Sequence, residues 1–133
     1  MSDSAAAVVL DTSALLAWLF GEPGADVVRE AIGPRAVVCA ANWAELARKV
    51  KDTGIDWSPV RNGLIALGVS VEPVTATDAE ESAGIGERRD GLSLGDRLCI
   101  AVGRRLNTDV LTADTAWSGL PGVVLIRTGA GRS

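Results

Sequence analysis

The chain has 133 residues, of which 47% are hydrophobic and 23% charged, and its 13 basic and 17 acidic residues give a formal net charge of −4. This composition is that of an ordinary globular protein, and the length suits a single domain over residues 1–133. The two cysteines exclude a disulfide scaffold, and the lack of histidine excludes a Ser-His-Asp triad, a Cys-His pair and a His-based zinc site.

In the first half of the chain, short apolar runs alternate with segments of helical periodicity. Glycine and proline separate these segments at 21–24 and 33–34. The predicted strands are 8–10 and 36–39, and the predicted helices are 13–20, 25–32, 42–51 and 56–67.

The second half continues this pattern. Its predicted helices are 77–89, which is interrupted by Gly84 and Gly86, and 94–106; its predicted strands are 69–71, 110–112 and 123–126. Short apolar strands separated by helices favour an α/β fold, with a parallel sheet that helices cover on both faces. Residues 1–6 and 128–133 are small or polar, and we expect frayed termini there.

Four carboxylates occur where the predicted strands end or the neighbouring helices begin. Asp11 ends the first strand and Asp114 follows the fourth, whereas Glu45 and Asp96 lie in the first turns of two helices. Because the carboxyl ends of parallel strands meet at one edge of a sheet, we expect all four carboxylates to converge there.

Each acid also fits a purely structural role. Asp11 fits a helix N-cap, Asp114 fits a turn, and Glu45 and Asp96 each fit a capping box that starts three residues earlier. Taken singly, each structural role is the commoner explanation. Taken together, four caps at one edge without an opposing cation would repel one another.

A hard divalent cation would explain the convergence, since Mg²⁺ prefers carboxylate oxygens and water. Such an ion lowers the pKa of a water that attacks a phosphodiester, and a second ion about 4 Å away stabilises the leaving oxygen. The four acids carry a charge of −4, equal to the net charge of the whole chain.

These acids lie in four segments that resemble the motifs of PIN domains: 8–17, 42–46, 92–101 and 110–114. The resemblance runs from Val8 to Ile126 and implies a three-layer α/β/α sandwich with a five-stranded parallel sheet. The compact length is similar to that of VapC toxins of type II toxin–antitoxin pairs. That similarity implies a Mg²⁺- or Mn²⁺-dependent endoribonuclease that leaves a 5′-phosphate and a 3′-hydroxyl.

The resemblance also implies particular partners and residues. The partners would be an RNA substrate, a second copy in a homodimer and a small DNA-binding VapB-like antitoxin, with which the toxin forms a heterotetramer or larger complex. Ser13 and Thr112 would orient the carboxylates or waters, and Trp117 stands where some relatives carry a further acid. The implied metal-binding and catalytic residues are Asp11, Glu45, Asp96 and Asp114.

Basic clusters are the candidate RNA contacts, despite the acidic net charge. Arg88, Arg89 and Arg97 are expected near the acidic edge and would contact RNA there, or lie on solvated helix faces. We expect Arg104 and Arg105 to be solvated, in the last turn of their helix. The remaining basic cluster is Arg48-Lys49-x-Lys51.

The tryptophans have both core and surface interpretations. Trp18 and Trp43 fall on apolar helical faces and are expected in the core or an interface. Trp57 and Trp117 are flanked by polar residues and would stack on a base, fill a partner's pocket or belong to the core.

Other functions fit the sequence less well. A phosphatase with an aspartyl intermediate requires a second Asp at position 13, where this chain has Ser13, and a receiver domain requires an acidic pair at the first strand end. A non-catalytic PIN-like interaction module stays open, although the complete set of four acids argues against it.

The sequence carries no signal for a membrane or for export. The most apolar stretch, residues 5–20, contains Asp11 and is shorter than the roughly 20 residues of a spanning helix. The first four residues carry an acid, Asp3, where a signal peptide has a basic region. We therefore expect a cytoplasmic protein without a membrane partner, in which Cys39 and Cys99 are buried thiols.

Overall fold

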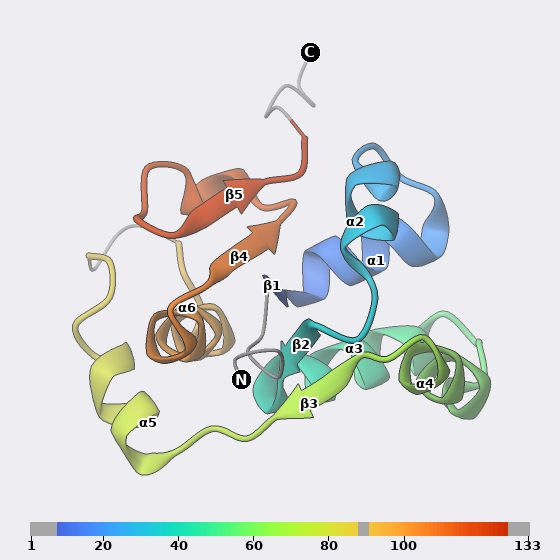
Figure 1. The fold of residues 1–133 in the computed structure, drawn as a ribbon, viewed down its shortest axis with the longest axis horizontal. Coiled ribbons are helices and arrows are strands. Elements are labelled where there is room, and N and C mark those ends of the chain that lie inside the picture. The colour runs from blue at the N-terminus through green and yellow to red at the C-terminus, as the bar shows by residue number, and fades with distance from the viewer. Residues whose placement is uncertain (1–7, 88–90, 128–133) are drawn as a thin grey trace.

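The computed structural model describes residues 8–87 and 91–127 and shows a five-stranded parallel sheet (Figure 1). The strands are β1 (Val8–Leu10), β2 (Ala36–Cys39), β3 (Ser70–Glu72), β4 (Asp109–Thr112) and β5 (Val123–Leu125). The helices are α1 (Thr12–Phe20), α2 (Ala25–Ala31), α3 (Ala40–Asp52), α4 (Trp57–Ala66), α5 (Ala76–Ser82), α6 (Leu94–Leu106) and the 3-10 helix η2 (Thr115–Trp117). The predicted α/β/α sandwich is confirmed.

The helices form a layer on each side of the sheet (Figure 1). Helices α1 to α4 lie on one side, and α5 and α6 lie on the other. Successive side chains of β1 point to opposite faces, so Val8 and Leu10 belong to one core cluster with α1, whereas Val9 belongs to the other with α6. Burial of both faces explains why these strands read as continuous apolar runs.

The order of the strands is β3-β2-β1-β4-β5. The chain moves outward from β1 to β3, then returns to place β4 beside β1, where Leu10 pairs with Leu111. Open sheets of this type bind ligands where the strand order reverses, outside the carboxyl ends of the strands. Here that point lies between the ends of β1 and β4, and the Asp11 amide donates to the Leu111 carbonyl at 3.1 Å.

Two predicted helix boundaries were wrong. Helix α5 ends at Ser82, and the described residues that follow it, as far as Glu87, are not helical. Gly84 weakens the helical pattern, and Gly86 adopts a φ of +75°, which a helix cannot contain. Helix α3 begins at Ala40 rather than Asn42, and its N-cap, Cys39, makes no side-chain capping bond.

The core confirms the prediction for the cysteines and selects one interpretation for Trp117. Cys39, Cys99 and Trp117 are all fully buried, so Trp117 is part of the core and cannot stack on a base. Burial raises the pKa of both thiols. Trp43 and Trp57 are partly buried against the core cluster that contains Val8 and Leu10. Their rings meet edge to face, with centroids 5.1 Å apart.

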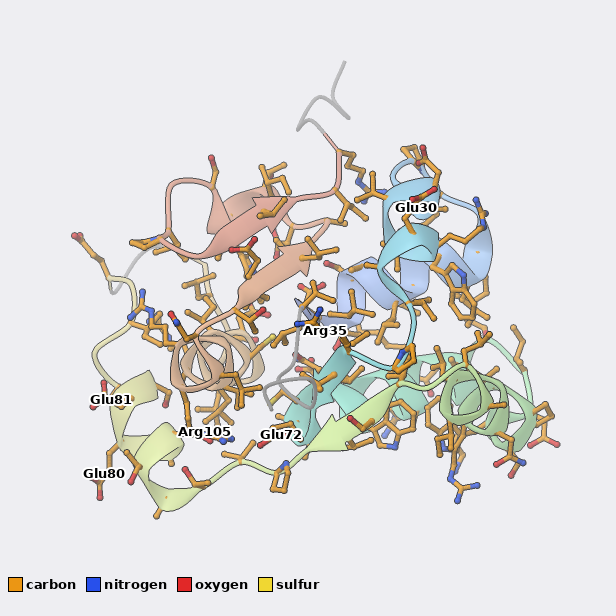
Figure 2. All side chains as sticks on the ribbon, in the orientation of Figure 1. Glu30, Arg35, Glu72, Glu80, Glu81 and Arg105 are labelled. Carbon is orange, nitrogen blue, oxygen red and sulfur yellow. The ribbon has the colours of Figure 1, made fainter. Side chains whose placement is uncertain are left out.

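Arg105 is exposed, as predicted, but its side chain also forms ion pairs that the sequence did not predict (Figure 2). Its guanidinium bonds Asp78 at 2.9 Å and Glu72 at 3.0 Å, and also donates to the Pro73 carbonyl. These bonds connect the end of α6 to α5 and to the edge strand β3. The neighbouring Arg104 is exposed, as predicted.

None of the described helices combines the length and the apolar character that crossing a bilayer requires. The terminal segments 1–6 and 128–133, for which we expected fraying, lie outside the described residues.

Candidate metal and catalytic site

The four predicted acids line a single cleft of about 320 Å³. The cleft lies at the point where the strand order reverses, and its walls come from α1, α3, the start of α6 and the residues after β4. The structure therefore brings together side chains that are up to 103 positions apart in the sequence. The lining residues are Asp11, Thr12, Ser13, Leu16, Glu45, Lys49, Ser93, Asp96 and Asp114.

Asp11 is the most buried of the four acids, with 3% of its surface exposed. Thr112 Oγ1 donates to its Oδ2 at 2.6 Å, the Ser13 hydroxyl lies 2.9 and 3.0 Å from its two oxygens, and the Ala14 amide donates to its Oδ1 at 2.8 Å. Burial raises the pKa of Asp11 to about 7, although these hydrogen bonds favour the ionised form.

The hydroxyls of Ser13 and Thr112 connect the first and fourth strand ends. They lie 3.1 Å apart, and they also accept hydrogen bonds from the amides of Ala113 and Asp114 at 2.9 and 3.0 Å. This network fixes the Asp11 carboxylate against the start of the loop that carries Asp114. Both side chains thus contact Asp11, one of the acids that the resemblance to PIN domains implies they orient.

Glu45 is held by two side chains that the sequence analysis did not assign to the site. Thr12 Oγ1 and Asn42 Nδ2 each donate to Glu45 Oε1 at 2.8 Å. The predicted capping box at Asn42 was wrong, because α3 begins two residues earlier and Asn42 lies inside it. Its buried amide therefore serves the carboxylate one turn further along the helix.

Asp96 and Asp114 are half-buried and combine their predicted structural roles with a place in the cleft. Asp96 forms a capping box with Ser93: its Oδ2 accepts from the Ser93 amide at 2.9 Å, and its own amide donates to Ser93 Oγ. Asp114 caps η2 through a 2.9 Å bond from the Ala116 amide. Burial, and then the negative charges of Asp114 and Glu45, raise the pKa of Asp96.

The charge of the cleft is strongly negative. Lys49, one turn after Glu45 on α3, is the one basic side chain among the described residues that line it. Across residues 8–87 and 91–127, no three Asp, Glu, His or Cys side chains are already grouped as closely as the ligands of a bound ion. Each carboxylate is instead held by hydrogen bonds from its own surroundings.

The donor set nevertheless fits a hard cation. The carboxylates and hydroxyls that line the cleft offer oxygen atoms as ligands, which Mg²⁺ and Mn²⁺ prefer. No sulfur atom or imidazole belongs to the described residues that line the cleft. A divalent ion would also offset the repulsion that contributes to the raised pKa values of Asp11 and Asp96.

The predicted RNA contacts are only partly described. Arg88 and Arg89 lie outside the described residues. Arg97 is half-buried and directs its guanidinium to the Glu87 carbonyl at 3.4 Å, and it does not belong to the residues that line the cleft.

A family model described as PIN domain matches residues 8–122 of the chain. The chain belongs to the PIN domain family. A search of curated proteins finds no match. Solved structures extend the comparison to nearly the whole length of this PIN domain.

A toxin–antitoxin complex from Klebsiella pneumoniae has a chain that is 22% identical, with a TM-score of 0.76, over 90% of this chain and 98% of that one. VapC20 of Mycobacterium tuberculosis, described as a Sarcin-Ricin loop cleaving toxin, is 21% identical with a TM-score of 0.68, over 88% and 97%. A chain of DNA-bound VapBC from Salmonella typhimurium is 14% identical with a TM-score of 0.62, over 90% and 96%. At these identities, the likeness establishes the fold of this PIN domain.

Proposed function

We propose that this PIN domain is a metal-dependent endoribonuclease and the toxin of a type II toxin–antitoxin pair. The observation that carries the proposal is the cleft in which Asp11, Glu45, Asp96 and Asp114 converge. The similar structures support the same conclusion, since one is described as a Sarcin-Ricin loop cleaving toxin, one as a toxin–antitoxin complex and one as DNA-bound VapBC.

Asp11, Asp96, Asp114 and Glu45 would hold one or two Mg²⁺ or Mn²⁺ ions. A bound ion lowers the pKa of water and offsets charge on the phosphate and the leaving oxygen. The chain contains no histidine to act as a general base, so the carboxylates and their cation are the groups left to activate water. Phosphodiester hydrolysis in this arrangement leaves a 5′-phosphate and a 3′-hydroxyl.

The other side chains in the cleft prepare the carboxylates and the substrate. Ser13 and Thr112 fix the orientation of Asp11 through short hydrogen bonds. The carboxylate would therefore not need to reorient when the cation binds. Lys49 places a positive charge beside the acids, where it would contact a phosphate of the RNA backbone. An RNA chain would therefore meet a cationic group at the wall of a negatively charged cleft.

The proposal includes partners and a compartment. The protein would form a homodimer and be neutralised by a small DNA-binding VapB-like antitoxin, in a heterotetramer or larger complex. It would act in the cytoplasm, where its RNA substrates are.

Expression in a bacterial host tests the proposed function. The wild-type protein should arrest growth, and co-expression of the small gene encoded beside it should restore growth. Asp96→Asn should be harmless, because it removes a carboxylate from the cleft, whereas the exposed Asp26→Asn on α2 should remain toxic. If folded wild-type protein accumulates without any effect on growth, the chain acts instead as a non-catalytic interaction module.

A further inference from the structure

Gly95 is the second residue of α6 and lies directly before Asp96. Its φ is not positive, so its backbone conformation does not require glycine. Glycine is also the poorest helix former apart from proline. The presence of glycine here therefore needs an explanation other than backbone geometry.

The space that a side chain at position 95 would occupy is filled by Glu45. A Cβ atom built on Gly95 would lie 2.9 Å from Cδ of Glu45 and 3.2 Å from its Oε1, and closer still to Oε2. All three nearest atoms belong to this one carboxylate. The carboxylate of α3 is thus packed directly against the first turn of α6.

Glu45 has little freedom to move away from an added methyl group. Two hydrogen bonds of 2.8 Å, from Thr12 Oγ1 and Asn42 Nδ2, hold its Oε1. Thr12 Oγ1 also lies 3.2 Å from the Asn42 carbonyl, which ties α1 to α3 at the same point. A side chain at position 95 would therefore have to break this clamp or push α6 away.

We infer that Gly95 is a positioning residue: its missing side chain lets the Glu45 carboxylate lie beside Asp96, and so sets the spacing of two acids across the cleft. The consequence for cation binding rests on the proposed function. The steric coupling between Gly95 and Glu45 does not rest on it, because it is a property of the metal-free protein.

A double-mutant cycle with Gly95→Ala and Glu45→Asp tests this inference. Asp lacks one methylene, so its carboxylate ends farther from position 95. In the wild-type background, Gly95→Ala should weaken Mn²⁺ binding roughly tenfold or more, as measured by calorimetry, and should lower the Tm of the metal-free protein by roughly 4 °C. In the Glu45→Asp background, the same methyl group should change the Mn²⁺ affinity less than about twofold and leave the Tm unchanged or higher.

Two other helical glycines provide matched controls. A Cβ on Gly63, in α4, meets nothing within 4 Å. Gly63→Ala should therefore leave the Mn²⁺ affinity unchanged and should not lower the Tm. A Cβ on Gly103, in α6, collides with Cγ2 of Val110, and neither of these two residues lines the cleft. Gly103→Ala should lower the Tm but leave the Mn²⁺ affinity of the folded protein within about twofold of the wild type.

The inference is overturned if Gly95→Ala binds Mn²⁺ and unfolds as the wild type does, or if its cost is the same in both Glu45 backgrounds. If the wild type itself fails to bind Mn²⁺, the proposed function fails. The Tm cycle in the metal-free protein then still decides whether Gly95 and Glu45 are coupled.

Discussion

The buried carboxylate of Asp11 should make the metal-free protein less stable as the pH rises from about 4 to about 7, and Asp11→Asn should remove this effect. The pKa of Asp11 rises from its ordinary value of 3.8 to about 7 in the fold. Within that window the folded state binds more protons than the unfolded state. Stability therefore falls as the pH rises and the carboxylate is forced to ionise inside the protein.

The size of the effect follows from the displacement of the pKa. Each tenfold change in proton affinity corresponds to about 1.4 kcal/mol, so the change from 3.8 to about 7 corresponds to about 4 kcal/mol lost by pH 8. Asn at this position keeps an oxygen for the Ala14 amide but disturbs the bonds from Ser13 and Thr112, at a cost of about 1 kcal/mol. The metal-free variant should thus be about 3 kcal/mol more stable than the wild type at pH 8.

Urea unfolding in EDTA at pH 5, 6, 7 and 8, followed by tryptophan fluorescence, measures the free energy of unfolding of the wild type and of Asp11→Asn. The difference between them isolates Asp11 from Asp96, whose raised pKa adds an effect of the same sign. The reasoning is refuted if the wild type is as stable at pH 8 as at pH 5, or if Asp11→Asn keeps the same dependence on pH. Mn²⁺ at 1,000 times its Kd should reverse the order, because it stabilises the wild type by about 4.1 kcal/mol, which exceeds the advantage of about 3 kcal/mol that the metal-free variant has.

Two further predictions concern basic side chains. Arg105→Met should destabilise the protein by about 2 kcal/mol in urea unfolding, because it leaves Asp78, which is 2% exposed, without its cation. The control Arg104→Met should be close to neutral, and equal effects of the two substitutions would contradict this account. Lys49→Met should raise the KM for RNA with little change in kcat and reduce the salt dependence of RNA binding by about one counterion, and Lys51→Met, which lies outside the cleft, should not.

The sequence predicted the sheet and the position of the acids because both depend on local pattern. Buried strands read as short apolar runs, such as Val8-Val9-Leu10, and an acid that follows such a strand must lie at its carboxyl end. Once strands are parallel, their carboxyl ends share one edge. Asp11 and Asp114 could therefore be placed together without any knowledge of the contacts between helices.

The supporting residues could not be predicted because they depend on where helices begin and how they pack. Asn42 looked like a cap only because the start of α3 was placed two residues late. Thr12 and Gly95 act on Glu45 through the approach of α1 and α6 to α3, which no spacing in the sequence encodes.

Long-range packing also decided the roles of two residues outside the site. Arg105 meets Asp78, 27 residues away, through the packing of α5 on α6. Trp117 is polar-flanked in the sequence yet fully buried, since η2 turns it into the core.

The central claim is that the four carboxylates make this PIN domain a metal-dependent ribonuclease. The most direct measurement is cleavage of labelled total RNA by the isolated protein in Mg²⁺, Mn²⁺ or EDTA, beside Asp96→Asn and Asp26→Asn. Discrete cuts should require the metal, disappear with Asp96→Asn and persist with Asp26→Asn. Cuts that persist in EDTA or with Asp96→Asn, or no cuts by a folded protein that binds Mn²⁺, would contradict the account.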